Sequence, residues 1–226
     1  MSEEQLSMDA KLGITAAKMD ELRKKINAGT WNTNMEQLIQ SWGEKAAGLR
    51  FMHQASGRSW KNFSNKLTLG SIGITTLSAI ASLVAASIDN NEAKNIVLYI
   101  VGGVGIASST LQSLKKFYNS EEKSADHNAI SRQFGSLYRY ITLQLTLSPE
   151  DRLPSNQLSE YTLKEYERLQ LEAPSIGGST IKLFKDTFKN SNQAVPDICE
   201  DEFNIRIYKP PVLESEIELN NAEKII

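Results

Sequence analysis

Two features of this sequence carry residue types that could do chemistry: a glycine-rich segment and a pair of histidines. The segment "IVGGVGIASS", residues 100–109, follows an apolar stretch and precedes a polar one. In dinucleotide-binding loops, glycines spaced G-x-G-x-x-G let backbone amides approach a pyrophosphate at the start of a helix. Gly103 and Gly105 match the first two positions, but Ser108 stands at the third, and the preceding segments have helical periodicity. We therefore expect no nucleotide cofactor.

Two stretches of the chain, residues 67–88 and 95–114, contain no formal charge. The two histidines, His53 and His127, lie at similar distances from them. His53 is 13 residues before Lys66, and His127 is 12 residues after Lys115. On adjacent antiparallel helices, both imidazoles would lie roughly 18–20 Å from the ends of those stretches, at ~1.5 Å per residue. A facing pair could be a pH sensor, half of a metal site, or two hydrogen-bonded core residues. The core interpretation is favoured, because a metal site needs more ligands than these helix faces offer.

Catalytic chemistry finds little support in the rest of the chain. Cys199 is the single cysteine, which excludes an intrachain disulfide and a cysteine-based zinc site. No Cys–His or Ser–His–Asp arrangement has a supporting local context. The uncharged stretches contain no Asp, Glu, Lys, Arg or His, so no proton relay or charged ion pathway is visible in them. We expect a non-enzymatic protein that holds no metal and no cofactor.

Composition excludes some partners and reveals an uneven distribution of charge. The chain of 226 residues has a formal net charge of −2, so no basic surplus points to nucleic acid. Residues 191–226 carry eight acidic and three basic side chains, a net charge of −5, which leaves +3 on residues 1–190. The first thirty residues are polar and lack the apolar core of a signal peptide.

Two long stretches without a formal charge must position the glycine-rich segment and the two histidines. They cover residues 67–88 and 95–114, and the linker "DNNEAK" joins them. A helix needs about 20 residues to cross the hydrocarbon layer of a membrane. The sequence therefore predicts a membrane-spanning hairpin of two antiparallel helices. The alternative is a hairpin buried inside a soluble helical bundle, which the many serines, threonines and glycines would allow.

Basic residues flank the outer ends of the hairpin rather than its linker. Around the outer ends stand Arg50, Arg58, Lys61, Lys66, Lys115, Lys116, Lys123 and Arg132. The linker holds Lys94 against Asp89 and Glu92. This asymmetry predicts that both termini lie on the cytoplasmic side of the membrane.

Long helices are predicted on that same side, so the fold class is all-α. An amphipathic helix over about residues 3–28 has apolar residues near heptad spacing and is expected to pack on its neighbours. The next helix begins at "TNME", where Thr33 and Glu36 have capping-box spacing, and continues unbroken into the first span. These two helices belong to an N-terminal unit, residues 1–32, and a helical domain, residues 33–190.

The helical domain continues beyond the hairpin with one apolar face that runs from Phe117 to Leu145 and ends near Pro149. Two shorter helices follow it, the first capped by Ser155. Residues 191–226 form an extended acidic tail in this interpretation, with a short strand at "FNIRIY". We expect the tail to become ordered only when a partner protein binds it.

Small residues spaced four apart predict helix-packing faces in both spans. Such residues let two backbones approach closely in lipid, within one hairpin or between copies of the chain. The predicted packing residues are Ser78, Ser82 and Ala86 in the first span, and Gly102, Gly103, Gly105, Ala107 and Ser109 in the second. We therefore expect a homo-oligomer in the lipid bilayer.

This order of elements resembles the SLATT family of two-transmembrane helical proteins. The resemblance covers about residues 35–190, from "SWGEKAAGLRFMHQASGRSWKNFSNKL" through the hairpin to "YERLQLEAPSI". It rests on order, on spacing, and on Trp42, His53, His127, Arg152 and Pro174. The resemblance implies a membrane effector that oligomerises and permeabilises membranes, often under a nucleotide-sensing partner, with related two-span proteins in large DNA viruses.

Two functions are open at this point. The first is a membrane anchor or scaffold that tethers a protein layer to the bilayer, for example a minor structural protein linking a virion's internal membrane to its capsid. The second is a pore-forming effector of SLATT type. The sequence favours the scaffold, because the spans contain packing faces but no polar stripe that would line a conducting lumen.

Overall fold

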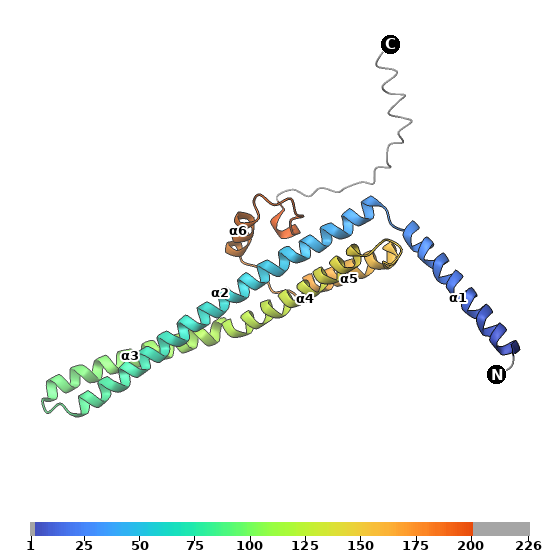
Figure 1. The fold of residues 1–226 in the computed structure, drawn as a ribbon. Coiled ribbons are helices and arrows are strands. Elements are labelled where there is room, and N and C mark those ends of the chain that lie inside the picture. The colour runs from blue at the N-terminus through green and yellow to red at the C-terminus, as the bar shows by residue number, and fades with distance from the viewer. Residues whose placement is uncertain (1–2, 201–226) are drawn as a thin grey trace, which may run out of the picture.

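The computed structural model of the protein describes residues 3–200, which are helical with no strand among them (Figure 1). The elements in chain order are α1 (Glu3–Gly29), α2 (Thr33–Ala86), α3 (Asn91–Tyr118), α4 (Ser120–Thr146), α5 (Ser155–Glu172), α6 (Gly178–Thr187) and the 3-10 turn η1 (Asp197–Cys199). The all-helical prediction is confirmed over these residues. The predicted strand at residues 203–208, and the predicted tail from residue 201 onward, lie outside the described residues.

A single helix of 54 residues, α2, runs along most of the molecule (Figure 1). The prediction that it continues unbroken into the first apolar stretch is confirmed. Its N-cap is Asn32, whose side-chain oxygen accepts a hydrogen bond of 2.9 Å from the backbone amide of Met35. The predicted capping box of Thr33 and Glu36 is therefore wrong, because Asn32 supplies the capping oxygen and Glu36 forms an ion pair with Arg152.

The chain returns along α2 as two helices, α3 and α4. Asn119 has a left-handed backbone, with φ 45° and ψ 41°, and separates α3 from α4. Asparagine is one of the few residues that adopts this conformation readily. The break turns Phe117 outward, where it is 80% exposed, while His127 and Phe134 of α4 face α2 and are buried. Phe117 was predicted on the same face as these two residues, and that prediction is wrong.

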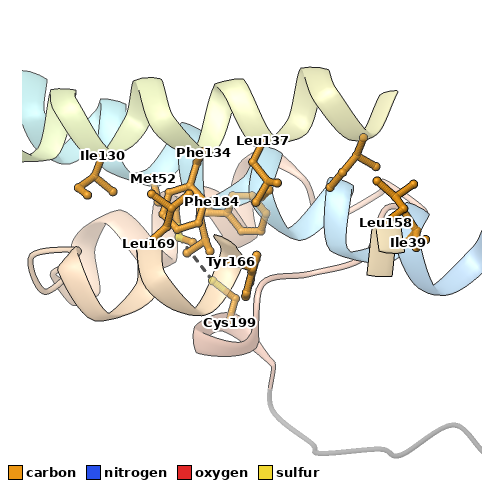
Figure 2. Close-up of a cluster of buried hydrophobic side chains, with 13 residues drawn as sticks. Ile39, Met52, Ile130, Phe134, Leu137, Leu158, Tyr166, Leu169, Phe184 and Cys199 are labelled. Carbon is orange, nitrogen blue, oxygen red and sulfur yellow. Dashed lines mark hydrogen bonds between the residues drawn. The ribbon is translucent and has the colours of Figure 1, made fainter. Parts of the chain in front are cut away.

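The hydrophobic core lies at the end of the molecule that is remote from the α2–α3 linker. It brings together α2, α4, α5, α6 and the chain around η1 (Figure 2). Its labelled members are Ile39, Met52, Ile130, Phe134, Leu137, Leu158, Tyr166, Leu169, Phe184 and Cys199. None of these residues comes from the hairpin stretches 67–88 and 95–114. We call this part the bundle, and the rest of α2 with α3 the hairpin.

Glycines and serines bring the backbones of α2 and α4 close together in the bundle. A Cβ atom at Gly57 would come within 2.8 Å of Asn128 Oδ1, and one at Gly43 within 3.1 Å of Ile141 Cγ2. Two buried serines of α4 cross this gap: Ser124 Oγ donates to the carbonyl of Gly57 at 2.8 Å, and Ser131 Oγ donates to that of Arg50 at 3.0 Å. These bonds satisfy buried hydroxyls and fix the register of the two helices.

Residues 194–200, which we call the latch, fold back onto the middle of the bundle part of α2. Lys45 forms ion pairs with Asp197 and, at 3.0 Å, with Glu200. Pro196 is buried, and Cys199 Sγ lies 3.6 Å from Met52 Sδ. The prediction of an extended tail from residue 191 differs from the structure over this part. Single residues of α2 hold the latch. Its own sequence therefore needs no periodic pattern that would have predicted this packing.

The first helix, α1, points away from the bundle (Figure 1). Its last turns are held by Asn27 Nδ2, which donates to the carbonyl of Arg152 at 2.5 Å, and by an ion pair of Lys24 with Asp151 at 3.4 Å. Met19 and Ile26 are each 63% exposed. Among the side chains of this helix that the structure describes, the predicted packing on neighbours is therefore seen in its last turns.

Gly48 leaves the space that the latch occupies, so Gly48→Ala should loosen the latch. An added Cβ would lie 2.6 Å from Pro196 Cγ and 3.2 Å from Phe184 Cε2. Overpacking of this kind costs about 1–3 kcal/mol. Cys199, the single thiol, belongs to the latch and is buried against Met52, and we expect a maleimide to label it roughly tenfold faster in the variant.

The matched control is Gly73→Ala in the same helix, where an added Cβ meets nothing within 4 Å. It should leave the labelling rate of Cys199 unchanged. Equal rates in wild type and Gly48→Ala would mean that the latch does not depend on this contact.

Candidate functional site

The hairpin exposes the apolar side chains that a soluble bundle would bury. Leu69, Leu77, Leu83 and Ile106 are 66–75% exposed, and no described element covers them. Both α2 and the α3–α4 stretch contain an 18-residue window that is apolar enough to cross a membrane, yet only 11% and 6% of these windows are buried. Soluble monomers rarely expose apolar patches of this extent. The alternative of a hairpin buried in a soluble bundle is therefore not the arrangement in the structure.

Outward-facing hydroxyls of the hairpin bond to their own helix. Five of them donate to the carbonyl four residues earlier at 2.8–3.0 Å: Thr76, Ser82, Ser109, Thr110 and Ser113. A hydroxyl that is satisfied in this way needs no hydrogen bond from water. The polar atoms of this surface are thus compatible with an apolar solvent.

Small residues at seven-residue spacing form the contact between α2 and α3. On α2 the members within the hairpin are Ser71, Ser78 and Ala85, each buried or half-buried. They continue the spacing of Gly57 and Ser64, which contact α4. Thr75 Oγ1 and Ser108 Oγ meet across the contact at 2.8 Å. This seven-residue spacing is typical of helices that wind around each other in a left-handed sense.

The predicted packing residues lie mostly on other faces of the hairpin. A Cβ added at Gly102, Gly103 or Gly105 would meet nothing within 4 Å. Six members of the set are exposed, namely Gly102, Gly103, Ser82, Ala86, Ala107 and Ser109, whereas Ser78 and Gly105 are half-buried. The structure therefore does not bring the glycines against Ser82 and Ala86.

The two histidines meet in the bundle core. His53 Nδ1 lies 2.9 Å from His127 Nδ1, and the two side chains are 1% and 2% exposed. The His53 ring also stacks on Phe134, with ring centres 5.8 Å apart and planes inclined by 13°. A bond between two Nδ1 atoms requires one of them to carry the proton and the other to be free of it. Two neutral rings in opposite tautomers satisfy this arrangement.

Burial holds both imidazoles in their neutral form. Loss of solvation, with a smaller contribution from His127, lowers the pKa of His53 to about 4. Burial also lowers the pKa of His127, although the nearby Asp126 opposes this effect. Among the described residues, no group of three or more His, Cys, Asp or Glu side chains is arranged to hold a metal ion. The geometry suits a packed, hydrogen-bonded pair.

Two charged residues that sequence patterns left without a role hold the bundle together. The Arg152 guanidinium binds Glu36, donates to the carbonyls of Leu145 and Leu147 at 3.1 and 2.8 Å, and lies 4.9 Å from the centre of the Trp31 ring. It thereby joins the α4–α5 turn to the start of α2. Lys45 joins the latch to α2 through its ion pairs with Asp197 and Glu200. A single charge in a loop or on a helix face carries no pattern that would reveal such partners.

Comparison with known proteins gives no relative for this chain: no family model, no curated protein and no solved structure matches it. The resemblance to the SLATT family stays a prediction. What the protein does must therefore follow from its own surface and contacts.

The buried histidine pair should make the fold sensitive to mild acid. The unfolded chain binds protons with the ordinary imidazole pKa near 6.5, whereas His53 in the folded chain stays neutral down to about pH 4. Acid therefore favours the unfolded chain. The stability present above pH 6.5 should be lost as the pH falls toward 4, by up to about 1.4 kcal/mol per pH unit. Circular dichroism in detergent micelles would follow this as a falling melting temperature.

His53→Gln provides the test of this assignment, because an amide can hydrogen-bond to His127 but cannot gain a proton in this range. We expect the fall between pH 6.5 and 5 to become clearly shallower. Gln54→His, at the exposed neighbouring position, adds an ordinary imidazole and should change nothing. An equally steep fall in His53→Gln would show that other groups cause the acid sensitivity.

Proposed function

We propose that this chain is a non-enzymatic integral membrane protein that serves as an oligomerising anchor or scaffold and tethers a protein layer to the bilayer. The observation that carries the proposal is the uncovered apolar hairpin, built on the same continuous helix as a well-packed polar bundle. Its outward hydroxyls are satisfied internally, so its surface suits lipid. A minor structural protein between a virion's internal membrane and its capsid is one setting that fits.

The latch supports the tether by giving the acidic tail a defined starting point. Lys45, which binds the latch, is 21 residues before Lys66 at the end of the uncharged stretch. At ~1.5 Å per residue, this separates the origin of the tail from the bilayer by roughly 30 Å. Residues 191–226 carry a net charge of −5, so a protein partner with a basic surface suits them. Both termini then lie on the cytoplasmic or capsid-facing side.

A pore-forming effector of SLATT type is the second candidate, and the outward glycine face favours it. Open space beside Gly102, Gly103 and Gly105 would let helices of other copies approach closely. The same face serves an oligomeric scaffold equally well. A conducting lumen needs polar groups that face water, whereas the hydroxyls of this hairpin bond to their own helices.

Insertion into the bilayer predicts that charge is tolerated on the bundle and not on the hairpin. Leu77, 66% exposed, lies at the centre of the first span, and Leu171, 88% exposed, lies on α5. Arginine at the centre of a spanning helix costs about 2.5–3.5 kcal/mol. Leu77→Arg should therefore lower the fraction of protein that resists alkaline carbonate extraction, while Leu171→Arg should leave it unchanged. Release of the wild-type protein by carbonate would end the proposal.

Liposomes separate the scaffold from the pore. We expect reconstituted wild-type protein to form crosslinked oligomers without releasing an entrapped dye. Gly103→Leu has room in a single chain but fills the face that would meet another copy, so it should lose the crosslinks. Robust dye release from wild type that Gly103→Leu abolishes would favour the pore instead.

The control for this experiment is Ile106→Leu, which keeps the volume of an exposed hairpin residue. It should crosslink as the wild type does. Crosslinks that persist in Gly103→Leu would mean that copies meet through a different face.

A further inference from the structure

Basic and aromatic side chains gather along the chain where the hairpin enters the bundle, and we call this group the collar. Its basic members are Arg58, Lys61, Lys66, Lys115, Lys116 and Lys123, and its aromatic members are Trp60, Phe63, Phe117 and Tyr118. The bundle core, the latch and the histidine pair use none of these residues. The collar follows directly on the uncharged stretches 67–88 and 95–114, so its level along the molecule is defined by them.

The aromatic members of the collar form one connected cluster on the surface. The Phe63 ring lies 6.0 Å from Trp60 and 5.6 Å from Tyr118, and Tyr118 lies 5.3 Å from Phe117, all edge to face. Phe117 is nevertheless 80% exposed. Packing within the chain does not explain an exposed aromatic cluster at this level. Aromatic rings of this kind are enriched where a membrane meets water.

The basic members are largely free of acidic partners. Lys115 binds Glu121 at 2.8 Å, and Lys123 lies over the Trp60 ring at 4.6 Å. With the residues that the structure describes, Lys61, Lys66 and Lys116 form no ion pair, and all three are exposed. Residues 58–66 and 115–123 together carry a net charge of +4.

The opposite end of the hairpin has a different character. The linker, residues 89–94, contains two acidic side chains and one basic side chain, a net charge of −1. The cationic surface therefore belongs to one end of the hairpin alone. A partner with negative charge is expected at that end and not at the other.

We infer that the collar binds the headgroups of anionic phospholipids in the leaflet on the bundle side. This rests on the proposed membrane insertion. The uncharged helices fix the collar at headgroup depth, the lysines present donors to phosphate oxygens, and Phe117 reaches into the acyl boundary. Each basic side chain near an anionic membrane surface favours binding roughly fivefold. A nucleic acid or an acidic protein would not require the exposed aromatic residues at this depth.

The test uses full-length protein in nanodiscs of phosphatidylcholine mixed with phosphatidylglycerol. Lipids retained by the purified protein are identified by native mass spectrometry. We expect phosphatidylglycerol to be enriched severalfold over its share in the disc. The triple variant Lys61→Gln, Lys66→Gln, Lys116→Gln should lose that enrichment, because it removes the unpaired charges of the collar.

A second triple variant with the same change in charge serves as the control. Lys164→Gln, Lys182→Gln and Lys189→Gln alter exposed lysines of the bundle and should keep the enrichment. Slow maleimide labelling of Cys199 in both variants verifies that each is folded. Insertion is measured separately, by resistance of each protein to alkaline carbonate.

The outcomes separate the inference from the proposed function. Wild-type protein that resists carbonate but retains the two lipids in their bulk ratio overturns the collar alone. Equal enrichment in both triple variants overturns it as well. Wild-type protein that carbonate releases overturns membrane insertion, and the collar with it.

Discussion

The close approach of α2 and α4 is the contact on which the rest of the structure depends. Glycine at position 57 removes the side chain that would collide with Asn128, and Ser124 of α4 then reaches the Gly57 carbonyl. Only at this helix separation can His53 and His127 share a proton at 2.9 Å. The His53 ring stacks on Phe134, and Phe134 in turn packs against Tyr166 of α5. Larger residues along this contact would separate the helices and leave the imidazoles without partners, which is costly in a buried site.

The two halves of α2 satisfy their hydroxyls in opposite ways, and the difference matches two kinds of surroundings. In the bundle, buried serines bond across to the neighbouring helix and so specify its register. In the hairpin, most hydroxyls bond back to the carbonyl four residues earlier in their own helix. Hydrogen bonds between helices favour one unique packing. Hydroxyls that bond to their own helix leave a surface that needs few hydrogen bonds from its surroundings. Thr75 and Ser108 are the polar tie between α2 and α3 within this apolar region.

Local patterns in the sequence predicted what depends on composition and period, and missed what depends on distant contacts. The two uncharged stretches, the unbroken α2 and the equal spacing of the histidines are all visible along the chain. The break at Asn119 was missed because a left-handed asparagine interrupts no apolar pattern. The latch was missed because it depends on the packing of Pro196 against Gly48, a residue far away in the sequence. The helix contact of the hairpin was sought at four-residue spacing, although Gly57, Ser64, Ser71, Ser78 and Ala85 display a seven-residue series.

That seven-residue series has a consequence for assembly. Because α2 is one continuous helix, its rotation about its own axis, which the bundle fixes, is the same in the hairpin. The apolar part of α2 must then meet α3 through its small residues, and Gly102 and Gly103 of α3 are left on an outward face. The direction of that face relative to the latch is therefore set by rigid helices. Copies that packed through Gly103 would hold their latches in one fixed orientation relative to the bilayer. A scaffold that orders a protein layer needs this property, whereas a flexible tether would lack it.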